Sequence, residues 1–214
     1  IISLVAVTGG EALAFSYYFK TLCLAFGWQI PLSNVAVALI VTIGFIIANV
    51  FGVRLTGRLQ NGLMFFFWGV AAIWFLTMIP NIELPNFVKS PKFIAKDKDF
   101  TFIGAVCMIW WCFAGFEACV AMGEEIRFPK INIPRAMFLA PFVVFCVNAL
   151  FQWYLIGITP VEKLASLATA EAPYAEAMKA AGIFGFPLAL LAAGIAFGGD
   201  FSTLNASIST TPRY

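Results

Sequence analysis

One carboxylate lies inside an apolar stretch of the chain, close to a residue that weakens helices, because Glu117 follows shortly after Gly115. An ionisable group within a membrane span is costly and usually marks a pathway for a substrate or an ion. Gly lowers helix propensity by about 1 kcal/mol relative to Ala, and an unwound turn can offer free backbone N–H and C=O groups to a ligand. The pattern therefore predicts a binding site at Gly115, where Glu117 holds an ammonium group, takes up a proton or locks a gate.

Two aromatic residues, Trp111 and Phe113, precede this glycine. They could close over a ligand, and an aromatic face can bind a cationic amine. The structural alternative is a continuous helix in which Gly115 allows close packing and Glu117 bonds a neighbouring helix. We favour the functional interpretation, because a charge within a membrane span is a functional site by default.

A second acid, Asp200, follows two glycines and precedes Ser202 and Thr203. The hydroxyl oxygens of Ser202 and Thr203 could be hard ligands for Na⁺, which makes these three residues candidates for ion coupling. The structural alternative is that Asp200 lies in the outer half of its span and pairs with a Lys or Arg.

A third acid, Glu11, follows Gly9-Gly10 and precedes Tyr17 and Tyr18 by about two turns. It could line a substrate cavity and favour a cationic ligand. It could equally be structural and bond a neighbouring helix, and the residues favour this second interpretation slightly.

The composition places these acids in a membrane protein. Hydrophobic residues make up 62% of the chain and charged residues 11%, whereas soluble domains carry about 25% charged residues. The net charge is only +2 and the cations are scattered, so no nucleic-acid partner is expected. The chain has no His, which removes His-based acid–base catalysis and the commonest metal ligand. We expect no metal and no cofactor.

Apolar runs predict the transmembrane helices, because crossing the bilayer takes about 20 apolar residues in a helix. The candidate spans are Ile1 to Ala25, Val35 to Val53, Leu59 to Ile79, Phe100 to Gly123, Ala136 to Ile158 and Ile183 to Thr210. Each must be helical, since lipid cannot satisfy an open strand edge. A polar loop is predicted from Asn81 to Asp99. Pro173 to Lys179 reads as a short helix that ends at Gly182. This segment is either an interfacial helix over one mouth of the bundle or an ordinary surface loop, and the sequence favours neither.

A charged turn follows the fourth span and contains Glu124, Glu125 and Arg135. In this turn Asn132 is predicted to cap the next helix, with Pro134 just inside its start. The sequence thus predicts an all-α, polytopic membrane protein, with residues 1–214 in a single transmembrane domain.

Several separate segments resemble one known family, in order along nearly the whole chain. They are Asn49-Val50-Phe51-Gly52-Val53-Arg54 with Gly57, Arg58 and Gln60; Trp111, Phe113, Gly115 and Glu117; Gly123-Glu124-Glu125; Pro129 and Asn132-Ile133-Pro134-Arg135-Ala136; Leu164, Ala172-Pro173 and Ala175; and Thr203-Leu204-Asn205-Ala206 with Arg213. Together they resemble the amino acid–polyamine–organocation (APC) permeases, at the turn between helices four and five, the sixth helix with its cytoplasmic loop, and the eighth helix. Single pieces are weak signals, whereas the ordered set is specific.

The resemblance implies that the six spans are helices three to eight of a permease with about twelve helices, built on the LeuT-type five-plus-five inverted repeat. The chain is then expected to be a fragment that lacks the first helix, which supplies half of the substrate site, and that does not transport alone.

The resemblance also assigns roles to residues. It places the substrate at the backbone of Phe113, Ala114 and Gly115, with Trp111 as an aromatic gate and Glu117 as the gating or coupling carboxylate. The turn with Glu124, Glu125 and Arg135 is implied to be a cytoplasmic gate. Proton-linked members can carry a Lys in the fifth helix, and this chain has none between residues 59 and 79, which argues against a lysine-based proton mechanism.

The function expected from these features is secondary active transport of an amino acid or related amine across the cell membrane, coupled to H⁺ or Na⁺. An antiporter that exchanges an amino acid for its amine product, and a non-transporting membrane subunit, are the alternatives. No paired nucleophile and base is visible, so an enzyme is not expected. No repeat typical of a selectivity filter indicates a channel.

Overall fold

The computed structural model describes residues 2–88, 126–160 and 170–211, together with residues 106, 113, 120, 123, 124, 162, 163 and 167. These residues form helices, turns and loops and contain no strand, which confirms the all-α prediction. Most of the predicted span from Phe100 to Gly123 lies outside the described residues.

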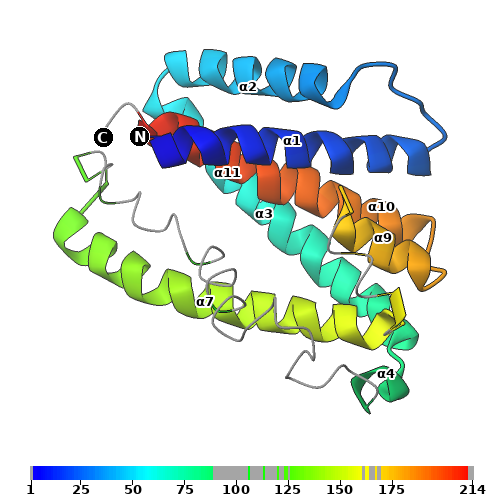
Figure 1. Ribbon diagram of the computed structural model, residues 1–214. Coiled ribbons are helices and arrows are strands. Elements are labelled where there is room, and N and C mark those ends of the chain that lie inside the picture. Colours follow the sequence, from blue (N-terminus) through cyan, green and yellow to red (C-terminus); the bar gives the residue numbers. More distant parts are fainter. Residues whose placement is uncertain are drawn as a thin grey trace.

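The first two helices form an antiparallel pair (Figure 1). Helix α1 spans Ile2–Ala25 and α2 spans Asn34–Val50, close to the predicted spans. The chain turns at Gly27, whose φ of 77° suits glycine. Ser33 then caps α2, because its Oγ accepts a hydrogen bond of 3.1 Å from the N–H of Ala36.

The next helix begins earlier than its apolar run suggests. Helix α3 spans Val53–Met78 rather than starting at Leu59, and Gly52 precedes it with a φ of 98°. Apolarity marks where a helix enters the lipid and not where its backbone begins, so the first turns can hold charged residues. The structure also places two short helices at the end of α3, η1 (Ile79–Asn81) and α4 (Leu84–Val88), where the sequence predicted only a loop from residue 81.

Helix α7, which spans Pro129–Ile158, corrects a second predicted boundary. Asn132 is not its N-cap. The N-cap is Phe128, in a left-handed conformation with φ 52°, and Pro129 takes the first helical position that its fixed φ suits. The side-chain amide of Asn132 donates instead to the carbonyl of Arg127.

The short helix before Gly182 and its stop agree with the prediction. Helix α9 spans Pro173–Ala180, and Gly182 follows with a φ of 73°. The N–H of Gly182 bonds the carbonyl of Lys179, and the N–H of Ile183 bonds that of Met178. These bonds satisfy carbonyls that the end of the helix would otherwise leave free.

The last predicted span is continuous but not uniform. It consists of α10 (Phe186–Ala193), the π-helix η2 (Gly194–Asp200) and α11 (Phe201–Thr210). This rod packs against both α1 and α3. In the 18-residue apolar stretch of each candidate span, the share that is buried inside the molecule is 56% for Phe186–Thr210, 17% for Leu55–Asn81 and 11% for Pro129–Ile158. The rod is therefore the central helix of the described bundle.

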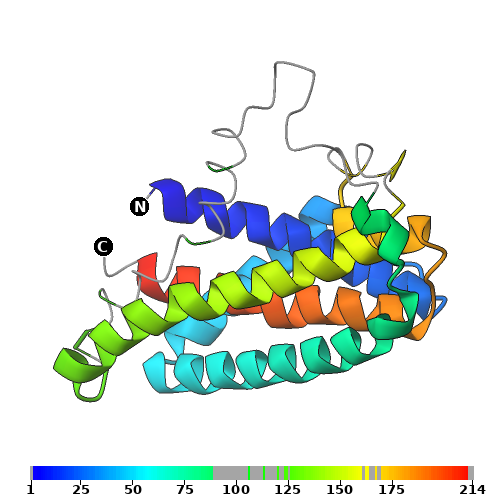
Figure 2. The same ribbon diagram turned by 90° about the horizontal axis from the view of Figure 1, so that it is seen from below.

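Among the described residues, three helices are long and apolar enough to cross a membrane: Leu55–Asn81, Pro129–Ile158 and Phe186–Thr210. Helix α2 is apolar but shorter, and α1 carries Glu11 and Lys20. Helix α7 packs mainly through its C-terminal end, which lies near α4 and α9 (Figure 2). The outer faces of α2, α3 and α7 expose many large apolar side chains, as expected where lipid is the solvent.

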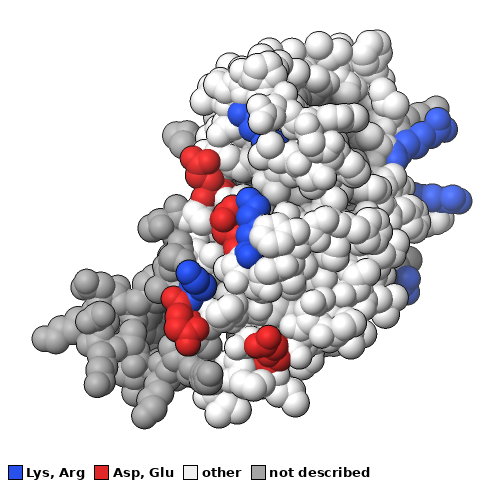
Figure 3. All heavy atoms as spheres, turned by 90° about the vertical axis from the view of Figure 1, so that its right-hand side faces the viewer, with Lys and Arg blue, Asp and Glu red and all other residues white. Residues whose placement is uncertain are grey.

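The end of the bundle that carries α9 shows a different surface (Figure 3). Charged side chains of both signs are scattered there among uncharged residues. This pattern is typical of a surface at a membrane–water boundary rather than within the hydrocarbon.

Candidate functional site

Two of the acids singled out in the sequence meet between α1 and η2. The side chains of Glu11 and Asp200 lie close enough to interact electrostatically. Glu11 is partly buried and Asp200 is 5% exposed. Within the described ranges no ion pair joins Asp200 to a Lys or Arg. The roles of Glu11 and Asp200 stay predictions.

Glycines explain how η2 holds Asp200 against α1. A Cβ at Gly198 would lie 2.7 Å from the Cβ of Phe67, and one at Gly194 would lie 3.1 Å from Val70. Both contacts are with α3, so α3 approaches the backbone of η2 where side chains are missing. Residues two positions apart lie on nearly opposite sides of a helix, so Asp200 points away from the α3 face and toward α1.

Phenylalanines near the two acids along α1 and the central rod pack against one another. Phe15, one turn after Glu11 on α1, stacks on Phe201 with ring centroids 4.4 Å apart. Phe201 also contacts Phe45 of α2 at 5.0 Å and Phe197 at 5.1 Å. An acid in such a setting has little water to stabilise its charge. The Oδ2 atom of Asp200 is buried without a hydrogen-bond partner in the described part of the chain.

The two hydroxyls next to Asp200 bond their own helix. The Oγ of Ser202 donates to the carbonyl of Gly199 at 2.8 Å, and the Oγ1 of Thr203 donates to the same carbonyl at 3.2 Å. Such back-bonding is common for Ser and Thr inside helices. Each hydroxyl keeps lone pairs that can accept a bond or ligate a cation. Their role as ion ligands stays a prediction.

The predicted substrate site falls largely outside the described residues. Trp111, Ala114, Gly115 and Glu117 are not described, and Phe113 lies in a turn, partly buried. Of the predicted cytoplasmic gate, Glu125 is outside the described residues.

The other two residues of that gate are exposed. Glu124 lies in a turn and Arg135 lies within α7 rather than before it. No ion pair joins these two residues in the structure. Their gating role also stays a prediction.

A second polar cluster joins three helices and was not predicted as a site. The Nδ2 of Asn205 in α11 donates to the Oε1 of Gln60 at 2.9 Å and to the carbonyl of Thr56 at 3.2 Å, both in α3. The Oγ1 of Thr56 donates to the Oδ1 of Asn49 in α2 at 3.2 Å. Asn49, Gln60 and Asn205 belong to the motifs quoted above, and the fold brings these two distant segments together.

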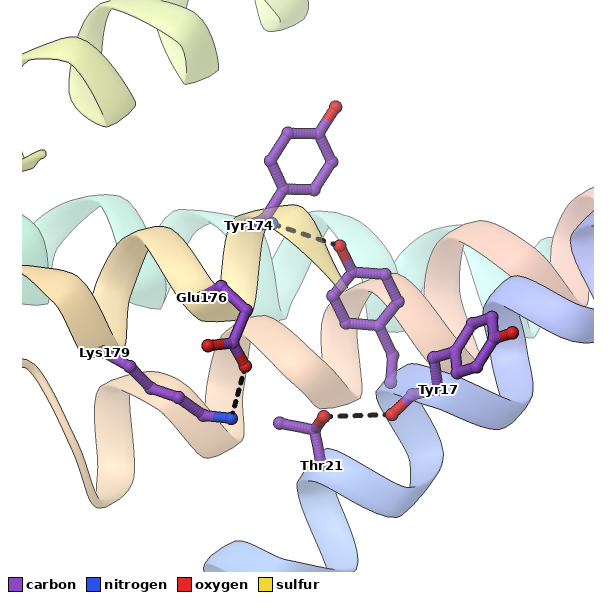
Figure 4. Close-up of polar contacts among 6 residues, drawn as sticks. Tyr17, Thr21, Tyr174, Glu176 and Lys179 are labelled. Atoms are coloured by element: carbon purple, nitrogen blue, oxygen red, sulfur yellow. Dashed lines mark hydrogen bonds and ion pairs between the residues drawn. The ribbon is translucent and has the colours of Figure 1, made fainter. Parts of the chain in front are cut away.

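A third contact joins the short helix α9 to α1 (Figure 4). The backbone N–H of Tyr174 donates to the hydroxyl of Tyr18 at 3.4 Å. On the same short helix, Lys179 and Glu176 form an ion pair of 2.7 Å at the surface. Helix α9 is thus held over the end of α1 by a tyrosine that the sequence had indicated only as a neighbour of Glu11.

Comparisons with known proteins identify the family. The chain matches the family described as amino acid permease over residues 1–212. It is 33% identical over 108 residues to proteins named uncharacterized transporters in Mycobacterium bovis and in two strains of Mycobacterium tuberculosis. The aligned stretch covers 50% of this chain and 24% of each relative. The chain thus spans about a quarter of the length of the curated relatives it matches.

A permease family agrees with the sequence-based expectation of a membrane transporter rather than an enzyme. On the match over residues 1–212, the chain belongs to the amino acid permease family.

Proposed function

We propose that the protein containing this chain is a secondary active transporter that moves an amino acid or a related amine across the cell membrane by alternating access. The observation that carries this proposal is the family match over residues 1–212. Residues 1–214 then form part of one multi-pass transmembrane domain in the lipid bilayer.

In this proposal the substrate binds at mid-membrane against a broken sixth helix. Backbone groups at Phe113, Ala114 and Gly115 bind it, Trp111 closes over it, and Glu117 gates or couples its movement. The support is the sequence pattern of Gly115 and Glu117 together with the family match. Two acids within apolar helices, the partly buried Glu11 and the buried Asp200, support transport more than anchoring, since acids within spans mark pathways.

An antiporter that exchanges an amino acid for its amine product is the second candidate. Trp111 and Phe113 favour it to the extent that an aromatic face binds a cationic amine. The two candidates differ in whether a preloaded amine speeds amino acid uptake.

The test is counterflow of labelled amino acids in proteoliposomes that contain the full-length protein. Saturable counterflow that Glu117→Ala abolishes and Glu176→Ala preserves would support the transporter. Glu176 is a suitable control because its ion pair with Lys179 lies at the surface of α9. Counterflow that survives Glu117→Ala would remove this residue from the mechanism, and current without saturation would indicate a channel.

A further inference from the structure

We propose that a cavity between α3, α7 and the central rod of α10 and η2 binds a small, neutral molecule that consists of one ring and one hydrogen-bond acceptor. The cavity has a volume of about 190 Å³, and Tyr174 of α9 also lines it. None of the described residues that line the cavity lies on α1 or between residues 111 and 117. The inference therefore does not depend on the proposed transport function.

The volume of the cavity decides the size of the ligand. Pockets for drug-sized molecules measure about 300–1,000 Å³, so this cavity is too small for such a molecule. An engineered apolar cavity of about 150 Å³ binds benzene. The cavity between α3 and α7 is somewhat larger than that, and it can hold one six-membered ring with a small substituent.

Aromatic side chains from three helices give the cavity walls that suit a flat ring. Trp74 of α3 lies against Phe151 of α7, with ring centroids 5.4 Å apart. Phe151 in turn meets Tyr174 of α9 edge to face, at 5.0 Å. Aromatic rings attract one another in offset and edge-to-face arrangements, so the ring of a ligand can pack favourably among these three.

The lining of the cavity also selects against charged ligands. The described residues that line it include no Asp, Glu, Lys or Arg. A charged group that enters such a setting loses its hydration and gains no opposite charge. A zwitterionic amino acid and a protonated amine are therefore excluded, which separates this cavity from the substrate site of the proposed function.

One polar atom in the cavity wall lacks a partner. Trp74 is 2% exposed, and its Nε1–H has no hydrogen-bond acceptor within the described ranges. A buried donor without an acceptor is costly, and the indole N–H of a buried Trp usually has one. An oxygen atom of the ligand would supply this acceptor, whereas a lipid acyl chain would fill the space and leave the N–H unpaired.

Helix α7 forms the outer wall of the cavity. Its lining residues Val147, Asn148 and Phe151 are only partly buried. A molecule dissolved in the membrane can therefore enter from the side of α7. The side-chain amide of Asn148 can accept a hydrogen bond from a ligand hydroxyl, so a phenol-like molecule suits the site best.

Fluorine NMR of the full-length protein in lipid nanodiscs tests the site with two matched probes, para-fluorophenol and fluorobenzene. The probes share the ring, and only the phenol carries an oxygen. Both should show saturable binding beyond their partition into empty nanodiscs. Ala71→Phe places a ring in the cavity and should abolish this binding. Ala72→Phe is the matched control, because it makes the same change at a neighbouring exposed position, and it should preserve the binding of both probes.

Trp74→Phe tests the hydrogen bond to the ligand. Phenylalanine keeps an aromatic ring in the wall and removes the Nε1–H. The affinity for para-fluorophenol should fall about three- to tenfold in this variant, whereas the affinity for fluorobenzene should change by less than about twofold.

Two kinds of result would overturn the proposal. Wild-type binding no greater than the partition into empty nanodiscs, or binding that survives Ala71→Phe in folded protein, would show that the cavity is not the site. An equal loss of affinity for both probes in Trp74→Phe would remove the need for an acceptor. Thermal unfolding without a probe checks that each variant folds. If Ala71→Phe does not fold, the contrast between the two probes in Trp74→Phe decides.

Discussion

Gly198 offers a sharp test of how the central helix is packed. In Gly198→Ala the added methyl carbon would meet Phe67 of α3 at 2.7 Å from its Cβ, 2.8 Å from its Cδ2 and 2.9 Å from its Cα. Rotating the phenyl ring moves only the Cδ2 atom. The clash with the backbone remains, so η2 and α3 must separate. Gly199→Ala is the matched control, because a Cβ there would meet nothing within 4 Å.

The difference between the two variants isolates the packing cost. Both replace Gly by Ala in the same helix, so the gain in helix propensity of about 1 kcal/mol is common to both. Overpacking a tight contact costs about 1–3 kcal/mol. We therefore expect Gly198→Ala to be less stable than Gly199→Ala by about 1–3 kcal/mol.

The assay is thermal unfolding of the full-length protein in one detergent, followed by intrinsic fluorescence. Gly198→Ala should unfold at least about 2 °C below Gly199→Ala. Adding Phe67→Ala should recover only part of the loss, because alanine at position 67 keeps the backbone and the first side-chain carbon that the new methyl group meets. Equal midpoints for Gly198→Ala and Gly199→Ala would refute the close approach of η2 and α3.

Two further contacts make separate predictions. Asn205→Leu should destabilise the protein by about 1–3 kcal/mol, because it leaves the Oε1 of Gln60 and the carbonyl of Thr56 without this donor; a thermal midpoint equal to that of the wild type would contradict the network. Tyr18→Phe removes an acceptor from the N–H of Tyr174 and should cost about 0.5–1.5 kcal/mol. Hydrogen exchange of the α9 amides should become faster in Tyr18→Phe, and unchanged exchange would show that α9 is held by other contacts.

Local chemistry explains the parts of the fold that the sequence predicted. The apolar runs located α1, α2 and the rod from 186 to 210, because the thickness of the bilayer sets the length of a span. The short helix α9 and its stop at Gly182 were also readable, since Pro at a helix start and Gly after its end act through their own backbone conformations. The starts of α3 and α7 were predicted too late, because a helix continues beyond the lipid into polar residues.

For the candidate site, the sequence did not predict that Glu11 and Asp200 lie close together. Each was visible as a costly acid within an apolar run, and neither run indicated the other as its partner. Their contact depends on the crossing of α1 and the central rod, which neighbouring residues do not set. The π-helix η2 was unpredicted for the same reason, since its glycines carry no periodic signal and their role depends on Phe67 and Val70 of α3.

The sequence by itself determined the solvent of this protein, the class of its fold and its family, because apolar content and motif order are properties of the chain alone. Only the tertiary structure places Glu11 close to Asp200. A side chain's partner across a helix interface depends on the rotation and depth of two helices at once, and these follow from packing at positions such as Gly198 rather than from the acids themselves.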